Sequence, residues 1–264
     1  MVASTTSSPT NSHKPLNIAL LGYRSNPYSG GQGVYLKHLA KALVDMGHRV
    51  DVISGEPYPE LDARVDLVRL PGLNLYAHPN PAWPLTQQRW RDPLNVFEWA
   101  SYWSGGFPEP FTFGHRLLRH FKTTRPRYDI IHDNQSLCTG LLGLMRRGYA
   151  VTSTIHHPIT FDRDIALQNT QEWGLRLLIR RWHRFLHMQT RVTRQLPYIT
   201  TVSENSKRDI ASAFGICEKR IEVVLNGIDS DIFQPMPTVA REPYHLITTA
   251  SADQPLKGTQ HLIP

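Results

Sequence analysis

The sequence contains little cysteine and no long apolar run, and both absences narrow the class of protein. Its two cysteines, Cys138 and Cys217, lie far apart. They form no Cys-x-x-Cys pair, so the sequence indicates neither a disulfide framework nor a zinc site. No stretch approaches the roughly 18 apolar residues that a membrane-spanning helix needs. These absences favour a protein of the reducing cytoplasm.

The first fifteen residues also lack an apolar stretch. A signal peptide requires one, whereas residues 1–15 are rich in serine, threonine and proline. We expect this segment to be a disordered tail that precedes the folded part of the chain.

Basic residues outnumber acidic ones. Lysine and arginine number 29 against 22 aspartates and glutamates, which gives a formal net charge of +7. A basic surface favours anionic partners such as phosphates, nucleotides and acidic lipids. No basic cluster interleaved with aromatic residues, no zinc-ligand spacing and no RNP-like pattern is present, so nucleic acid is not an expected partner.

A glycine-rich loop, Ser29-Gly30-Gly31-Gln32-Gly33, joins an apolar strand at 16–22 to an amphipathic helix at 33–46. Glycine allows backbone amides to approach a ligand closely, and the helix N-terminus behind it offers free N–H groups and a partial positive charge. The loop therefore predicts a phosphate site. In the alternative interpretation, Gly30 and Gly31 only turn the chain and Gly33 allows the helix to pack closely on the sheet. The loop alone leaves both interpretations open.

Two common phosphate-binding fingerprints do not fit this loop. The dinucleotide motif Gly-x-Gly-x-x-Gly needs a third glycine where this chain has Leu36. A mononucleotide P-loop needs Gly-Lys-Ser or Gly-Lys-Thr, but Val34 and Tyr35 follow Gly33. The loop therefore matches neither the dinucleotide-binding fingerprint nor the P-loop of mononucleotide-binding proteins.

Short apolar segments alternate with helical ones along most of the chain, which predicts an α/β fold with a doubly wound parallel sheet. The expected strands are residues 16–22, 49–54, 65–70, 128–132, 150–155, 198–202 and 221–225. Residues 71–110, which are rich in proline and tryptophan, interrupt this pattern as an insertion. Their aromatic residues favour a small core of their own over a surface that stacks on a sugar or lipid.

Polar residues follow the predicted strands, at the edge where parallel sheets bind ligands. Those residues are His132, Asn134, His156, His157 and Asn226. His156 is the candidate catalytic residue because it lies at the same edge as the glycine loop. Alternatively, His156 has a structural role, in which its side chain forms hydrogen bonds with backbone groups at the end of the strand.

The tandem histidines, His156 and His157, precede Asp162 and Asp164, a pattern that could also indicate a metal site. Adjacent side chains on an extended chain point apart, so both imidazoles cannot readily bind one ion. We expect no metal site.

Residues 172–196 predict one long helix with an apolar stripe and an arginine-rich face. Such a helix could lie on an anionic membrane surface, or it could pack its stripe on the sheet with the arginines in water. The first alternative would place the protein on the inner face of the membrane.

Several motifs occur in a fixed order from about Leu16 to the end of the chain, and together they resemble glycosyltransferase family 4, which has the GT-B fold. They are Gly30-Gly31-Gln32-Gly33-Val34-Tyr35, His38-Leu39-Ala40, Gly47-His48, Tyr128-Asp129-Ile130-Ile131-His132, Thr201-Val202-Ser203, Asn226-Gly227-Ile228-Asp229, Phe233-Gln234-Pro235 and Lys257-Gly258. The resemblance implies two Rossmann-like domains that face each other across a cleft. It further implies transfer from a nucleotide-sugar donor to a sugar, lipid or small-molecule acceptor, with retention of anomeric configuration.

The resemblance also implies roles for single residues and implies no cofactor and no essential metal, since the nucleotide sugar is a substrate. Gly30, Gly31 and Gly33 would belong to the donor site, where the loop lies against the diphosphate and the sugar. His156 would touch the transferred sugar, and Lys257 would neutralise charge on the leaving diphosphate. His132, Asn134, His157 and Asn226 remain candidates for the acceptor side or the rim of the cleft.

The same resemblance implies how the chain is divided into domains. Residues 16–237 are expected to form the acceptor-side domain, and residues 238–264 a linker with the first strand of a truncated donor domain, starting near Tyr244. Residues 250–254 lack the arginine that family members commonly place before the lysine–glycine pair, and the family's downstream glutamates would lie beyond Pro264. We therefore expect an inactive fragment.

Two other functions fit parts of the sequence. A nucleotide-sugar epimerase of GT-B fold would bind a similar donor without an acceptor. A non-catalytic module that binds the membrane surface through residues 172–196 is the alternative from a different class.

Overall fold

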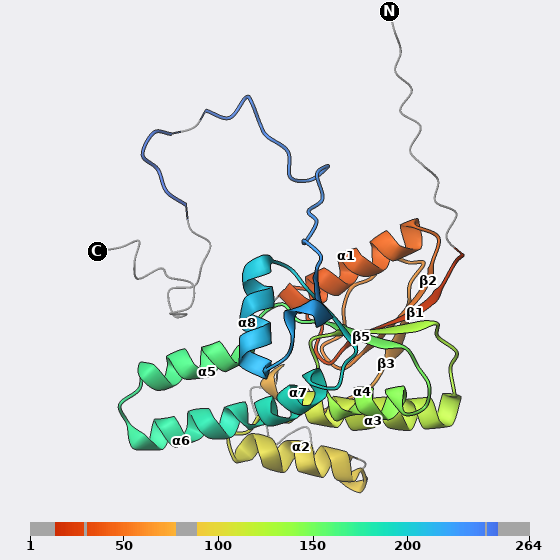
Figure 1. Ribbon diagram of the computed structural model, residues 1–264, viewed down its shortest axis with the longest axis vertical. Coiled ribbons are helices and arrows are strands. Elements are labelled where there is room, and N and C mark those ends of the chain that lie inside the picture. The colour runs from red at the N-terminus through yellow and green to blue at the C-terminus, as the bar shows by residue number, and fades with distance from the viewer. Residues whose placement is uncertain (1–13, 29–30, 78–88, 241, 248–264) are drawn as a thin grey trace, which may run out of the picture.

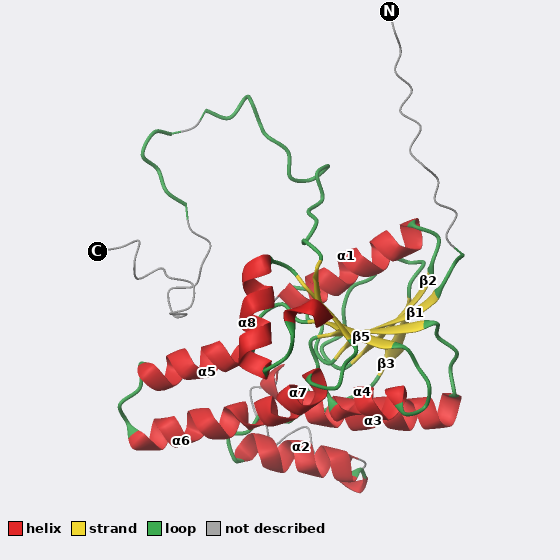
Figure 2. Cartoon of the chain, in the orientation of Figure 1, coloured by secondary structure: helices red, strands yellow, loops and turns green. Residues whose placement is uncertain are grey.

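The computed structural model describes residues 14–28, 31–77, 89–240 and 242–247. They form an α/β domain around a seven-stranded sheet in the order β3-β2-β1-β4-β5-β6-β7, in which all neighbours are parallel (Figures 1 and 2). The strands are β1 (Asn17–Gly22), β2 (Arg49–Ser54), β3 (Asp66–Arg69), β4 (Ile130–Asn134), β5 (Val151–Thr154), β6 (Tyr198–Thr201) and β7 (Ile221–Val223). The predicted doubly wound parallel sheet is confirmed.

Helices cover the sheet on both faces (Figure 1). They are α1 (Gly31–Asp45), α2 (Pro93–Trp103), α3 (Glu109–Thr124), α4 (Thr139–Met145), α5 (Ile159–Gln168), α6 (Trp173–Trp182), α7 (Leu186–Thr193) and α8 (Glu204–Phe214). Alternate residues of β1 enter two different cores: Leu20 joins Leu36 of α1, and Leu21 joins the cluster that contains Leu117 of α3. This alternation explains why the strand is apolar throughout, since both of its faces are buried.

Helix α1 ends where the sequence predicts. Gly47 has a φ of +88°, which favours glycine, and its N–H donates to the carbonyl of Val44 at 2.9 Å. The chain then enters β2 at Arg49, in register with Asn17 of β1.

The prediction of one continuous helix over 172–196 is wrong. Helix α6 ends at Trp182, a 3-10 turn covers His183–Phe185, and α7 follows. The two helices differ in burial: α7 buries Leu186 and Val192, whereas α6 has no buried residue. The break separates a segment that packs in the core from one that forms a projecting pair with α5 (Figure 1).

The insertion at 71–110 packs α2 against α3. Buried Glu98 of α2 accepts a hydrogen bond from the Leu73 amide at 3.1 Å and pairs with Arg116 of α3 at 2.6 Å. Trp99 packs between Trp90 and Trp103, with ring centroids 5.9 and 6.1 Å away. Trp90 is 50% and Trp103 54% exposed, so this aromatic cluster is only partly the small core that the sequence predicts. Trp83 lies outside the described residues.

Beyond β7 the chain leaves the domain as an exposed segment (Figure 1). Neither helix nor strand occurs in the described residues between 224 and 247. The predicted strand near Tyr244 is therefore not formed at 244–247, and its remainder lies outside the described residues. The division into residues 16–237 and 238–264 stays a prediction.

Candidate functional site

The candidate site lies at the carboxyl ends of β1, β4 and β5. Because β2 and β4 flank β1 on opposite sides, the strand order reverses there, and parallel sheets bind ligands outside such a point. Helix α1 begins at this edge, at Gly31, so the last three residues of the predicted glycine loop form the first turn of the helix.

The glycines of the loop differ in their surroundings. A Cβ on buried Gly33 would lie 2.2 Å from the carbonyl oxygen of Asn26, so close packing of backbone explains this glycine. Gly31 is exposed, and none of the described residues lies within 4 Å of the position that a Cβ would take there, so the described part of the chain leaves the first turn of α1 accessible to an anion. Gly30 lies outside the described residues.

His156, two residues beyond the end of β5, is tied to the start of α1 through Asn134 at the end of β4. The Asn134 side-chain amide donates to the backbone carbonyl of Gln32 at 3.2 Å, and its Oδ1 lies 2.8 Å from His156 Nε2. Since the Asn134 oxygen can only accept, Nε2–H of His156 is the donor. The Nδ1 atom has no hydrogen-bond partner among the described residues, which leaves it as an acceptor for a ligand hydroxyl.

Burial keeps this imidazole neutral. Desolvation, followed by the charge of His157, lowers the pKa of His156 to about 4. The ring of Tyr35 on α1 meets it edge to face, with centroids 4.7 Å apart. A neutral, fixed imidazole is suited to recognise a hydroxyl group rather than to carry charge.

His132 of β4 lies below this rim. Its Nε2 is 2.8 Å from Thr154 Oγ1, which is 2.7 Å from the Thr200 hydroxyl and 3.2 Å from the Tyr35 hydroxyl. Burial lowers the pKa of His132 to about 4. Its partners are protein side chains, so the structure favours a supporting role for His132.

Gln135 fixes the backbone that carries both histidines. Its Oε1 accepts from the His156 amide at 2.7 Å, and its Nε2 donates to the His157 carbonyl at 2.7 Å. Gln135 has a φ of 53° and Leu137 a φ of 47°, an uncommon conformation for these residues.

Buried Asp133 holds that turn. Its carboxylate accepts hydrogen bonds from the Leu137 amide at 3.0 Å, from the Ser153 hydroxyl at 2.9 Å and from the Ser136 hydroxyl. Burial raises the pKa of Asp133, while these hydrogen bonds oppose the effect.

The two adjacent histidines point to different partners. His156 contacts Asn134, whereas exposed His157 lies 3.2 Å from Asp162 of α5. The two side chains thus point apart, as we expected from their adjacent positions on an extended chain. Within the described ranges, no group of three or more histidine, cysteine, aspartate or glutamate side chains is arranged to hold a metal.

Two other predicted residues are not brought to this site by the described contacts. Asn226 is exposed beyond the edge strand β7 and forms no hydrogen bond with the described residues around His156. Lys257 lies outside the described residues.

A second polar cluster beside the ends of β1 and β2 was missed by sequence reasoning. Arg24, after β1, donates to both carboxylate oxygens of buried Glu109 at 2.9 and 3.1 Å. Desolvation raises the pKa of Glu109 to about 7 despite this arginine. Burial, with the charge of Glu109, raises the pKa of Tyr23 to about 12. Arg24 at a strand end was a weak signal, but nothing local marks Glu109.

The model of the family described as "Glycosyltransferase Family 4" matches residues 29–232, from the glycine loop to the segment after β7. The chain belongs to glycosyltransferase family 4. The predicted family and its α/β GT-B architecture are thereby confirmed, with the parallel sheet as one Rossmann-like domain.

Two curated relatives match almost the whole chain. "MMP alpha-(1->4)-mannosyltransferase" of Mycolicibacterium hassiacum is 43% identical over 94% of this chain and 60% of its own length. "D-inositol 3-phosphate glycosyltransferase" of Kribbella flavida is 24% identical over 95% of this chain and 57% of its own length. The chain thus spans less than two thirds of either relative.

Proposed function

We propose that the chain carries the acceptor-side domain of a retaining glycosyltransferase that moves a sugar from a nucleotide-sugar donor to a hydroxyl acceptor. The observation that carries the proposal is the neutral imidazole of His156, held by Asn134 beside the open N-terminus of α1. This arrangement places a nitrogen atom that can accept a hydrogen bond from a hydroxyl group beside a site for an anion. A nucleotide sugar carries both hydroxyl groups and a negatively charged diphosphate. Family membership supports the same chemistry.

In the proposed reaction the bond between the anomeric carbon and the phosphate oxygen breaks, and the anomeric carbon bonds to the acceptor oxygen. The acceptor proton passes to the leaving phosphate. The first turn of α1 would stabilise the negative charge that grows on the diphosphate. His156 Nδ1 would accept a hydrogen bond from a hydroxyl of the transferred sugar and so fix its position.

The names of the relatives favour one transferred sugar, but they do not favour one acceptor molecule. The relative at 43% identity is named for mannose transfer, which favours mannose as the transferred sugar. The second relative is named for an inositol phosphate at 24% identity, so the acceptors of such relatives differ. We propose no metal and no cofactor, and leave the acceptor as a sugar, lipid or small molecule with a free hydroxyl.

The 264-residue chain is proposed to turn over little by itself. It spans 60% of the mannosyltransferase relative, and the donor-binding half of such an enzyme would lie mainly in the unmatched part. A fused protein that carries that unmatched part from the Mycolicibacterium hassiacum relative allows the test.

Kinetics of the fused protein with nucleoside-diphosphate mannose test the role of His156. We expect His156→Ala to lower kcat/KM by about 10- to 100-fold, because one buried hydrogen bond to the sugar is lost. His187→Ala, which removes an exposed imidazole of α7, is the matched control. Equal kinetics of the two variants would contradict the role of His156.

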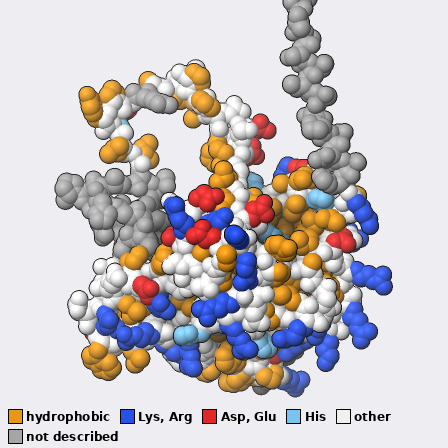
Figure 3. All heavy atoms as spheres, viewed as in Figure 1, with side chains coloured by type: hydrophobic (Ala, Val, Ile, Leu, Met, Phe, Trp, Pro, Cys, Tyr) orange, Lys and Arg blue, Asp and Glu red, His pale blue; other side chains and the backbone are white. Residues whose placement is uncertain are grey.

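Helix α6 supports peripheral binding to the cytoplasmic face of an anionic membrane as a further part of the proposal. Trp173 is 81% exposed and Leu177 is 59% exposed, and basic Arg180 lies on the same side of the helix. Figure 3 shows hydrophobic and basic side chains together over the projecting α5 and α6. In the described part of the chain, no helix is long and apolar enough to cross a bilayer.

Vesicle co-sedimentation separates this membrane role from a merely solvated helix. We expect binding to vesicles with anionic lipid and little binding to zwitterionic ones, with a loss of at least about threefold in Trp173→Ser. Met46→Ser, at an exposed apolar position on the other side of the domain, serves as the control. Binding that ignores anionic lipid would remove the membrane part of the proposal.

A further inference from the structure

His156 is held by two contacts that both come from the start of helix α1. Asn134 is 1% exposed, and its side-chain amide joins His156 Nε2 to the backbone carbonyl of Gln32 in the first turn of α1. Tyr35, three residues further along the same helix, packs its half-buried ring against the imidazole. The same first turn of α1 is the proposed anion site, so one helix carries the anion site and holds the imidazole.

The carbonyl of Gln32 fixes which way the Asn134 side chain faces. A backbone carbonyl can only accept, so Asn134 presents its NH₂ group to Gln32 at 3.2 Å and its oxygen to His156 at 2.8 Å. The backbone of α1 therefore sets which imidazole nitrogen carries the proton, and leaves Nδ1 as the acceptor. One hydrogen bond at Nε2 does not prevent the ring from tilting about that bond, so the direction of Nδ1 needs a second contact.

The ring of Tyr35 supplies this second contact. It meets the imidazole of His156 at an interplanar angle of 85° with the centroids 4.7 Å apart, an edge-to-face arrangement that aromatic pairs favour. The tyrosine is fixed at both ends, because its backbone belongs to α1 and its hydroxyl lies 3.2 Å from Thr154 Oγ1 of β5. A tilt of the imidazole would break the packing between the two rings. The Tyr35 ring therefore limits the directions in which Nδ1 can point.

The same ring also takes the place of water beside His156. Burial is the main cause that lowers the pKa of His156 to about 4, and a ring packed against the imidazole contributes to that burial. Removal of the Tyr35 ring would admit water to this side of the imidazole and favour its charged form. The pKa of His156 would then return toward its ordinary value of 6.5.

We propose that Tyr35 is a positioning residue for His156, and that its ring rather than its hydroxyl directs Nδ1 toward the transferred sugar. Together with Asn134 it joins the imidazole and the first turn of α1 into one unit. A nucleotide sugar then meets a hydrogen-bond acceptor and an anion site whose separation is fixed before it binds. This inference rests on the proposed role of His156 in sugar transfer, and it does not require Tyr35 to touch the substrate.

An NMR titration of the imidazoles in the 264-residue chain tests this packing without any substrate. His156→Gln identifies the His156 signal, which should barely move between about pH 8 and pH 5 in wild type and in Tyr35→Phe, because both keep the ring. In Tyr35→Ala the pKa of His156 should rise to about 5 or above, because water reaches the imidazole. A His156 signal in Tyr35→Ala that titrates as in wild type would overturn the proposal.

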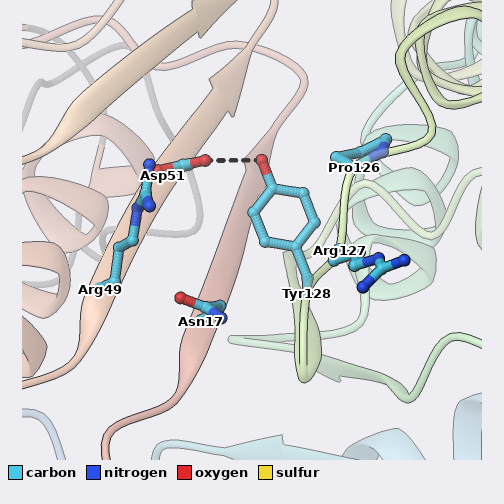
Figure 4. A pocket seen from close by; sticks show the side chains of 6 residues that line it. All are labelled: Asn17, Arg49, Asp51, Pro126, Arg127 and Tyr128. Carbon is cyan, nitrogen blue, oxygen red and sulfur yellow. Dashed lines mark hydrogen bonds between the residues drawn. The ribbon is translucent and has the colours of Figure 1, made fainter.

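Kinetics of the fused protein test the role of the ring in sugar transfer. Tyr35→Leu keeps apolar volume and suits a helix, and it should lower kcat/KM by about 3- to 10-fold, whereas Tyr35→Phe should stay within about twofold of wild type. Tyr128→Leu is the matched control. Tyr128 is also half-buried, but it lies at the opposite edge of the sheet, where its hydroxyl donates to Asp51 at 2.7 Å (Figure 4). Its loss should leave kcat/KM unchanged.

A double-mutant cycle separates positioning of His156 from a general structural effect. Because Tyr35 acts through His156, Tyr35→Leu should change kcat/KM by less than about twofold in a protein that already carries His156→Ala. A full effect of Tyr35→Leu in that protein would refute the positioning role, and so would a Tyr35→Phe variant as slow as Tyr35→Leu. A wild-type fused protein that transfers no sugar would instead contradict the proposed function, and the imidazole titration would still decide whether Tyr35 shields His156.

Discussion

Acid should destabilise this domain through His132, and the size of the effect follows from its burial. The imidazole is neutral in the folded protein, where burial lowers its pKa from 6.5 to about 4. In the unfolded chain it takes up a proton near its ordinary pKa. The unfolded state therefore binds more protons between these two values, so stability falls as the pH falls through this window.

The linkage relation gives the magnitude. Between pH 7 and pH 5, His132 alone should remove about 2 kcal/mol of the free energy of unfolding, and about 3 kcal/mol below pH 4. His156 acts in the same direction because its pKa is also about 4, whereas Glu109 acts in the opposite direction. A comparison of wild type with a His132 variant separates the contribution of His132 to the loss of stability from the contributions of His156 and Glu109.

Equilibrium unfolding in urea at pH 7 and pH 5, followed by tryptophan fluorescence, measures this share. His132→Gln lowers stability at pH 7 because it disturbs the contact with Thr154, but its loss of stability between the two pH values should be about 2 kcal/mol smaller than in wild type. Exposed His187→Gln should show the wild-type loss. If His132→Gln also shows the wild-type loss, the argument that His132 stays neutral in the folded state is refuted.

Three further predictions concern other parts of the domain. Glu109→Gln should enlarge the loss of stability that wild type shows between pH 7 and pH 5, because the folded pKa of Glu109 is raised to about 7 and its protonation opposes the effect of the histidines; urea unfolding at pH 5 and pH 7 measures it. Gly33→Ala should cost about 1–3 kcal/mol, visible as a lower Tm, because its Cβ would meet the Asn26 carbonyl 2.2 Å away. Gln135→Ala should cost about 1–3 kcal/mol and speed amide hydrogen exchange at His156, because it removes the hydrogen bond to that amide. An unchanged exchange rate would show that Gln135 does not hold this backbone.

The sheet could be predicted from sequence because its signal is local. Each strand contains apolar or β-branched residues within a short segment, and in β1 alternate residues such as Leu20 and Leu21 fill two cores. The same applies to the end of α1, where Gly47 alone provides the left-handed turn. Parallel pairing then followed from the alternation of strands and helices.

The break between α6 and α7 could not be predicted in the same way. The apolar stripe continues across residues 172–196, so its periodicity gives no boundary. The difference lies in what each half packs against: Leu186 and Val192 reach the core, while Trp173 and Leu177 remain exposed. Such tertiary partners are not encoded within one helical segment.

The candidate site was predictable by position but not by geometry. The strand ends placed His156 and Asn134 at one edge, and the structure joins them at 2.8 Å. The roles of Gln135 and Glu109 depend on partners 21 and 85 residues away along the chain, so no local pattern marks them. Gly33, included in the predicted donor site, is explained first by close packing against Asn26.

The most direct test of the proposed function is the mass of the products formed by the fused protein from nucleoside-diphosphate mannose and a sugar acceptor. We expect an acceptor that is heavier by one sugar residue, with one nucleoside diphosphate released for each transfer and an α-configured new bond. A nucleotide sugar converted to its epimer, with the acceptor mass unchanged, would contradict it.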